Sequence, residues 1–138
     1  MGGVSAHAGL FGDTGDLAIF CQMLLNGGAY DHRRIVPAQH SWRSSLPGRT
    51  FPKAAAAPTG LGHAFEWKFR WRSLLSHSSF GHTGFTGTSA WIDPTRELFI
   101  ILLTNRVHPS RENNAIREVR RLVADGVVKA VDIDPLIH

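Results

Sequence analysis

The clearest helical pattern in the chain runs from Asp13 to the sequence Asn26-Gly27-Gly28. Between these points apolar residues recur at helical spacing, namely Leu17, Phe20, Cys21 and Leu24. Asp13 or Thr14 can cap the first turn, and Asp16 is favourably placed near a helix N-terminus. Because Asn-Gly-Gly is a typical stop signal, we predict an amphipathic helix that ends there.

A second helical pattern follows His108-Pro109, from about Arg111 to Ala130. Its apolar stripe consists of Ile116, Val119, Val123 and Val127, and arginines lie opposite this stripe. We predict that this helix lies across one face of a sheet.

The segments Ser76–Phe85 and Thr88–Asp93 have the composition of neighbouring strands. Gly84 and Gly87 between them mark a bend or a bulge. We therefore expect the two strands to be antiparallel neighbours.

A third strand is predicted from Leu98 to Thr104. Asp93-Pro94-Thr95-Arg96 has the chemistry of a type I turn, which joins this strand to the preceding one as a hairpin. The run Leu98–Leu103 is apolar without alternation, which is typical of a central strand, covered on both faces and paired on both edges.

The segment Phe65–Arg72 alternates aromatic and charged residues without a break. Period two places the rings on one face and the charges on the other, which predicts a half-buried strand. A groove that stacks single-stranded nucleic acid needs both kinds of residue on the same face, so the structural interpretation is preferred.

Prolines interrupt residues 29–62, where we predict only a short helix around Pro37–Trp42. Lys53–Pro58 reads as a surface loop or a single turn. Together these patterns predict one partial domain over residues 1–138, with an α/β (α+β) fold. Its core is an antiparallel sheet of three or four strands with flanking helices.

Composition supports a globular domain: of the 138 residues, 43% are hydrophobic and 19% are charged. No apolar run approaches the roughly 20 residues that a bilayer crossing needs. The start Met-Gly-Gly-Val-Ser-Ala lacks the basic and apolar parts of a secretion signal. We therefore expect no membrane partner and, by default, a cytoplasmic location.

The net charge is +4, and twelve of the fifteen basic residues are arginines. They are interspersed with acids, as in the last predicted helix, which is typical of a solvated helix face. We expect no nucleic-acid partner.

The eight histidines do not have the spacing of a metal site. His77 and His82, five residues apart in a predicted strand, project to opposite faces. Cys21, the single cysteine, is predicted to be a buried small apolar residue rather than a reactive thiol. We expect no metal and no cofactor.

A serine nucleophile needs an adjacent base, and Ser-x-x-Lys is one compact solution. None of Lys53, Lys68 and Lys129 follows a serine by three residues, and Thr50 before Lys53 is interpreted as a coincidence. A Gly-x-Ser-x-Gly motif is also absent from the sequence.

An ordered set of short motifs nevertheless resembles the C-terminal part of the serine beta-lactamase and penicillin-binding-protein superfamily, over residues 3 to about 125. Class C beta-lactamases and lactamase-like carboxylesterases are the most similar in style. The motifs are Gly3-Val4, His7-Ala8-Gly9-Leu10-Phe11, Asp16-Leu17-Ala18, Leu24-Leu25-Asn26-Gly27-Gly28, Gly81-His82-Thr83-Gly84-Phe85-Thr86-Gly87-Thr88, Trp91-Ile92-Asp93-Pro94 and Leu103-Thr104-Asn105-Arg106-Val107-His108-Pro109.

The resemblance implies a binding strand that carries the triplet His82-Thr83-Gly84. His82 and Thr83 would face a polar or carboxylate group of the substrate, and Gly84 would let the substrate lie against the strand. The backbone N–H of Phe85 would be one oxyanion donor. Asn105 and Arg106 are further candidates for substrate contact.

The family's chemistry implies a serine hydrolase that acts on a beta-lactam or a short-chain ester through an acyl-enzyme. The family's Ser-x-x-Lys and Tyr-x-Asn motifs lie upstream of the Gly-His-Ala-Gly-Leu-Phe type of segment with which this sequence opens, and the single tyrosine, Tyr30, fits neither. The attacking residue is therefore not identified. The alternative is a noncatalytic binding or assembly module derived from a truncated hydrolase.

In the family's sheet, the strand that corresponds to Leu98–Thr104 pairs with a strand from the N-terminal segment. An apolar edge without that neighbour is an association site. We therefore expect a homodimer or a larger assembly through this edge and the face of the last helix.

Overall fold

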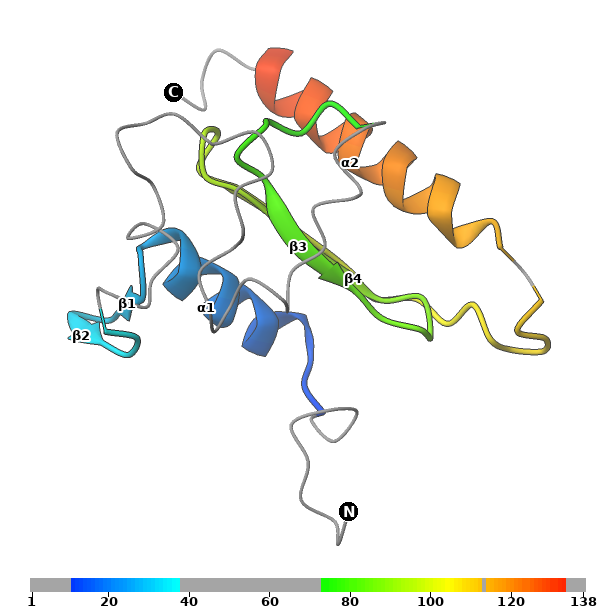
Figure 1. Cartoon of the computed structure of the whole chain (residues 1–138), viewed down its shortest axis with the longest axis horizontal. Helices are drawn as coiled ribbons and strands as arrows, with labels where there is room; N and C mark the ends of the chain where they lie inside the picture. The colour runs from blue at the N-terminus through cyan, green and yellow to red at the C-terminus, as the bar shows by residue number, and fades with distance from the viewer. Residues whose placement is uncertain (1–10, 38–72, 113, 134–138) are drawn as a thin grey trace, which may run out of the picture.

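The computed structural model describes residues 11–37, 73–112 and 114–133. A three-stranded sheet lies between two helices (Figure 1). A small two-stranded ribbon follows the first helix. In chain order the elements are α1 (Thr14–Leu25), β1 (Ala29–Tyr30), β2 (Arg33–Arg34), β3 (Phe80–Thr83), β4 (Ser89–Asp93), β5 (Leu98–Leu102) and α2 (Ile116–Ile133).

The larger sheet is antiparallel, with the strand order β3-β4-β5. Its register pairs Phe80 with Ile92 and Trp91 with Ile100. Two tight connections join the strands, one over residues 84–88 and the other over 94–97. The predicted α/β class, with an antiparallel sheet and flanking helices, is confirmed.

Both faces of this sheet are apolar and covered. The α1 face carries a buried cluster of Cys21, Met23, Leu24, Leu25, Phe80 and Ile92, with Phe99 and Ile101 packed against it. The α2 face carries Leu75, Trp91, Ile100, Ala124 and Val128, with Leu98, Val123 and Val127. Neighbouring residues of a strand thus enter opposite clusters, which explains why the apolar run of β5 does not alternate. The prediction that both faces of this strand are covered is confirmed.

Strand β5 occupies one end of the described sheet. Within residues 11–37, 73–112 and 114–133 it pairs with β4 alone, so the predicted pairing on both edges is not seen in this part of the chain. The helices that cover its two faces hold β5 in place.

Helix α1 begins and ends where the sequence predicts. Asp13 is the N-cap: its Oδ1 accepts the Asp16 N–H at 3.0 Å, and Asp16 Oδ2 accepts the Asp13 N–H at 3.3 Å, which completes a capping box. At the other end, Gly27 and Gly28 have φ values of 70° and 95°. These left-handed conformations favour glycine and end the helix.

The ribbon β1–β2 was not predicted. Its two central residues, Asp31 and His32, have φ values of 48° and 59°, as a hairpin turn with both residues left-handed requires. Asp and His tolerate this conformation better than most residues do, which is the signal that the sequence offered.

Several boundaries differ from the prediction, and the strands are shorter than expected. Strand β3 starts at Phe80 rather than at Ser76, because the backbone from Ser76 turns, with the Ser79 N–H donating to the Ser76 carbonyl at 3.1 Å. Helix α2 runs from Ile116 to Ile133, later than predicted. Its C-terminal part is tied to the β4–β5 turn, since Arg96 Nε donates to Asp132 Oδ1 at 3.2 Å.

Several predictions lie outside the described residues. They concern the helix around Pro37–Trp42, the loop Lys53–Pro58, the strand Phe65–Arg72 and the opening segment up to Leu10.

We predict that Asp93→Ala destabilises the fold by about 3 kcal/mol, because it removes a buried carboxylate that several donors need. Asp93 is 0% exposed and accepts the N–H groups of Ser76 and Thr95, at 2.7 and 3.1 Å, together with the Ser76 hydroxyl and the Arg96 guanidinium. Urea denaturation followed by circular dichroism measures the loss. The exposed Glu112→Ala is the control, and equal stability of the two variants would contradict the prediction.

Candidate functional site

An open groove lies along β3 on the α1 face of the sheet, with a volume of about 260 Å³. His82, two residues after the core residue Phe80, projects to that face and is exposed. The groove is lined by Leu17, Phe20, Cys21, Leu24, Gly81, His82, Gly84, Thr88, Ser89, Ala90, Ile92 and Leu103.

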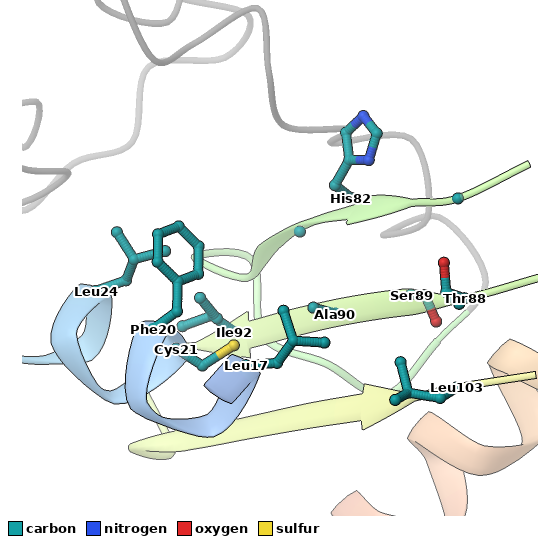
Figure 2. Close-up of a pocket in the computed structure, with 12 residues that line it drawn as sticks. Leu17, Phe20, Cys21, Leu24, His82, Thr88, Ser89, Ala90, Ile92 and Leu103 are labelled. Atoms are coloured by element: carbon teal, nitrogen blue, oxygen red, sulfur yellow. The ribbon is translucent and has the colours of Figure 1, made fainter. Parts of the chain in front are cut away.

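The groove is mostly apolar, with polar groups at one end. Figure 2 shows the imidazole of His82 projecting from β3, whereas Phe20 and Leu24 project from α1 on the other side. Phe20, predicted as part of the apolar stripe of α1, is 50% exposed because it borders the groove instead of entering the core. Such a site suits a ligand with an apolar body and a polar terminus.

The triplet His82-Thr83-Gly84 is divided between the two faces. His82 and Gly84 line the groove, whereas Thr83 is half-buried and lies on the opposite face by strand alternation. A Cβ atom at Gly84 would collide with Thr88 Oγ1, so this glycine allows the two strands to meet closely at the turn.

Backbone hydrogen bonds close the turn over residues 84–88. The Gly84 N–H donates to the Thr88 carbonyl at 2.8 Å, and the Gly87 N–H donates to the Gly84 carbonyl at 3.2 Å. Phe85 at the tip is 67% exposed. In the described residues its N–H has no acceptor among the hydrogen bonds, so it is available to an external acceptor.

Arg106 fastens this turn from the segment after β5. Its Nε donates to the Phe85 carbonyl at 2.6 Å, and its guanidinium lies 4.6 Å from the centroid of the Phe85 ring. Its Nη1 donates to the Arg111 carbonyl at 3.0 Å. These bonds give the guanidinium a structural role beside the turn, and its predicted contact with substrate stays a prediction.

Asn105 is exposed, and its Oδ1 accepts the Val107 N–H at 3.1 Å. This local bond shapes the chain after β5. Substrate contact by Asn105 likewise stays a prediction.

A second arginine, which the sequence pattern does not distinguish from its neighbours, reaches the turn from α2. Arg120 is 8% exposed, and its Nη2 donates to the carbonyls of Gly84 and Thr88 at 2.9 and 2.8 Å. Its position in an arginine-rich helix suggested only a solvated face. Only the packing of α2 on the sheet separates this buried arginine from its exposed neighbour Arg117.

Two serines near the groove, Ser79 and Ser89, are buried. Ser79 is 4% exposed, and its hydroxyl donates to the Ser76 carbonyl at 2.8 Å. Ser89 borders the groove and is buried. Three further serines, Ser5, Ser41 and Ser45, lie outside the described residues.

Cys21 is buried, as predicted, although one side of it borders the groove. Burial raises the pKa of its thiol to about 11, because an apolar surrounding disfavours the thiolate. A thiol of this kind is a poor nucleophile near neutral pH.

Two further observations concern the described residues. They bring together no group of three or more His, Cys, Asp or Glu side chains suited to a metal ion. No helix among them has both the length and the apolar character that crossing a bilayer demands.

We predict that Gly84→Ala destabilises the fold by about 1–3 kcal/mol, because the new methyl group overlaps Thr88 Oγ1. Thr88→Ala alone should cost less than about 1 kcal/mol at this half-buried position. The double variant Gly84→Ala/Thr88→Ala should regain most of the loss, since the colliding atom is gone. Urea denaturation of all four proteins forms the cycle, and additive losses would contradict the predicted steric cause.

Comparison with known proteins identifies the family of this chain. A family model described as Beta-lactamase matches residues 1–125. A protein of Escherichia coli K12 named "Putative D-alanyl-D-alanine carboxypeptidase" is 37% identical over 116 residues, which cover 78% of this chain and 25% of that protein. A protein of the same name from Salmonella paratyphi B is 39% identical over 118 residues, with the same shares. The chain thus spans a quarter of the length of these curated relatives, and it belongs to the beta-lactamase family of serine hydrolase-like proteins.

Proposed function

We propose that this chain forms the substrate-binding side of an acyl-transfer site that hydrolyses a beta-lactam or a short-chain ester through an acyl-enzyme. In this reaction a serine oxygen attacks the carbonyl carbon, and water later releases the acyl group. The chain contributes His82 and the Phe85 N–H, and the attacking residue is not identified, because the sequence contains no Ser-x-x-Lys motif.

The observation that carries the proposal is the position of the Phe85 N–H relative to His82. His82 lies on β3 and lines the groove, whereas Phe85 lies at the tip of the turn that directly follows this strand. A backbone N–H with no internal acceptor is the group that stabilises the oxyanion of a tetrahedral intermediate. An imidazole beside it can hydrogen-bond a polar group of the same substrate.

The relatives' name suggests a second substrate class within the same chemistry. Those proteins are named for a peptide that ends in D-alanyl-D-alanine. Such a peptide has a terminal carboxylate next to a small apolar side chain, which fits a groove that is apolar along α1 and polar at His82. We include it among the substrates to be tested.

We predict that the pure chain binds a short peptide ending in D-Ala-D-Ala and that His82→Ala weakens this binding about tenfold, the cost of one hydrogen bond to a charged group. Amide shifts in nitrogen-proton spectra measure both the affinity and the site. His77→Ala is the matched control, because His77 is also exposed but lies outside the groove lining. Equal losses in both variants would count against the site.

Turnover is tested on the same protein with a chromogenic lactam and a short-chain p-nitrophenyl ester. Ser5, Ser41, Ser45, Ser79 and Ser89 are each changed to alanine. Loss of turnover in one variant identifies a nucleophile in this chain. Binding without turnover supports a chain that forms only the substrate-binding side of the site. Turnover that survives all five serine substitutions indicates a contaminating enzyme.

A noncatalytic assembly module remains the second candidate, favoured by apolar side chains that the described residues leave exposed. Leu103 after β5 is 42% exposed, and Val119 and Leu122 on α2 are 39% and 55% exposed. We propose a second copy of the chain as the occupant of this surface, paired through the Leu98–Thr104 edge.

This second proposal predicts a dimer at micromolar concentration by light scattering. Leu122→Lys should raise the dissociation constant of the dimer about tenfold or more, because a lysine would replace a leucine that the proposed dimer buries. Arg117→Ala, an exposed change on the same helix, is the control. A wild-type monomer throughout the concentration series would contradict the proposed dimer.

A further inference from the structure

The turn over residues 84–88 is held from behind by a buried cation. Arg120 lies on α2, which packs on the face of the sheet opposite to α1 and the groove. One nitrogen of its guanidinium bridges the carbonyls of Gly84 and Thr88, the two residues that close the neck of the turn. Since burial of a guanidinium is costly unless it is hydrogen-bonded, these bonds fix the arginine and the turn together.

The geometry of the peptide bond links this cation to the predicted oxyanion donor. The Gly84 carbonyl and the Phe85 N–H belong to the same planar trans peptide group, so they point in opposite directions. A donor that holds the Gly84 oxygen on one side therefore orients the Phe85 N–H toward the other side. Because α2 and the groove lie on opposite faces of the sheet, an N–H that points away from Arg120 points toward the groove face.

The hydrogen bond from Arg120 to the Gly84 carbonyl also makes the Phe85 N–H a stronger hydrogen-bond donor. A cation at the carbonyl oxygen draws electron density through the conjugated peptide group and makes its N–H a better donor. Arg106 contributes in the same sense to the next peptide, since its Nε donates to the Phe85 carbonyl at 2.6 Å. Two guanidinium groups thus donate to carbonyls of the turn, and their positive charge favours an anion beside it.

We propose that Arg120 is a positioning residue, which orients and polarises the Phe85 N–H as an oxyanion donor by holding the Gly84 carbonyl. The inference rests on the proposed function, because it assumes that Phe85 faces the developing oxyanion. Arg120 on α2 would thus act through the Gly84 carbonyl and would not touch the substrate itself.

The experiment follows the Phe85 amide in the nitrogen-proton spectrum of the full 138-residue chain, with methylphosphonate as a tetrahedral oxyanion probe. The wild-type amide should shift saturably with the probe. Arg120→Met should raise the dissociation constant about tenfold or more and move the Phe85 proton resonance upfield, because the N–H loses its polarising partner. Arg120→Lys, which keeps the charge, should recover part of both effects.

Arg117→Met is the matched control, an exposed arginine one turn earlier on the same helix, and it should leave both readouts unchanged. If Arg120→Met has lost the native spectrum, Arg120→Lys decides alone. A folded Arg120 variant that binds the probe as tightly as the wild type, with an unshifted Phe85 resonance, overturns the inference and leaves the proposed function intact. A wild-type Phe85 amide that does not respond to the probe overturns both.

Discussion

Burial of both faces of one antiparallel sheet is the constraint on which the rest of the described structure depends. Trp91 and Ile92 are neighbours on β4, yet they enter different apolar clusters, one beneath each helix. At about 25 cal/mol per Å² of buried apolar surface, a sheet of this kind is stable only with a helix on each side. Removal of either helix would expose one complete cluster to water.

The candidate site is a consequence of this arrangement (Figure 1). Among the described residues, helix α1 covers its face of the sheet only partly, and the groove that His82 lines runs beside β3 on this face. Helix α2 covers the other face and carries Arg120 to the turn after β3. One helix thus borders the groove beside the turn, while the other supports the turn from the opposite face of the sheet.

Local signals predicted most of the described elements. The capping residue Asp13 and the glycines after Asn26 delimit α1 correctly, and the Asp93-Pro94-Thr95-Arg96 turn joins the strands as expected, with the Arg96 N–H bonded to the Asp93 carbonyl at 3.3 Å. These features depend on residues within a few positions of one another. The start of β3 was predicted less well, because the buried carboxylate of Asp93 captures the Ser76 backbone from a distance of 17 residues.

The sequence by itself determined the family, the apolar run that both helices cover, and the triplet around which the site forms, because motif order and hydrophobic period are properties of the chain. Only the tertiary structure decided that Phe20 borders a groove, that Arg106 holds a carbonyl, and that Arg120 is buried. The physical reason is that an arginine looks the same in sequence whether its helix face meets water or a strand turn. Its partners are backbone carbonyls more than 30 residues away, and a carbonyl group has no sequence signature.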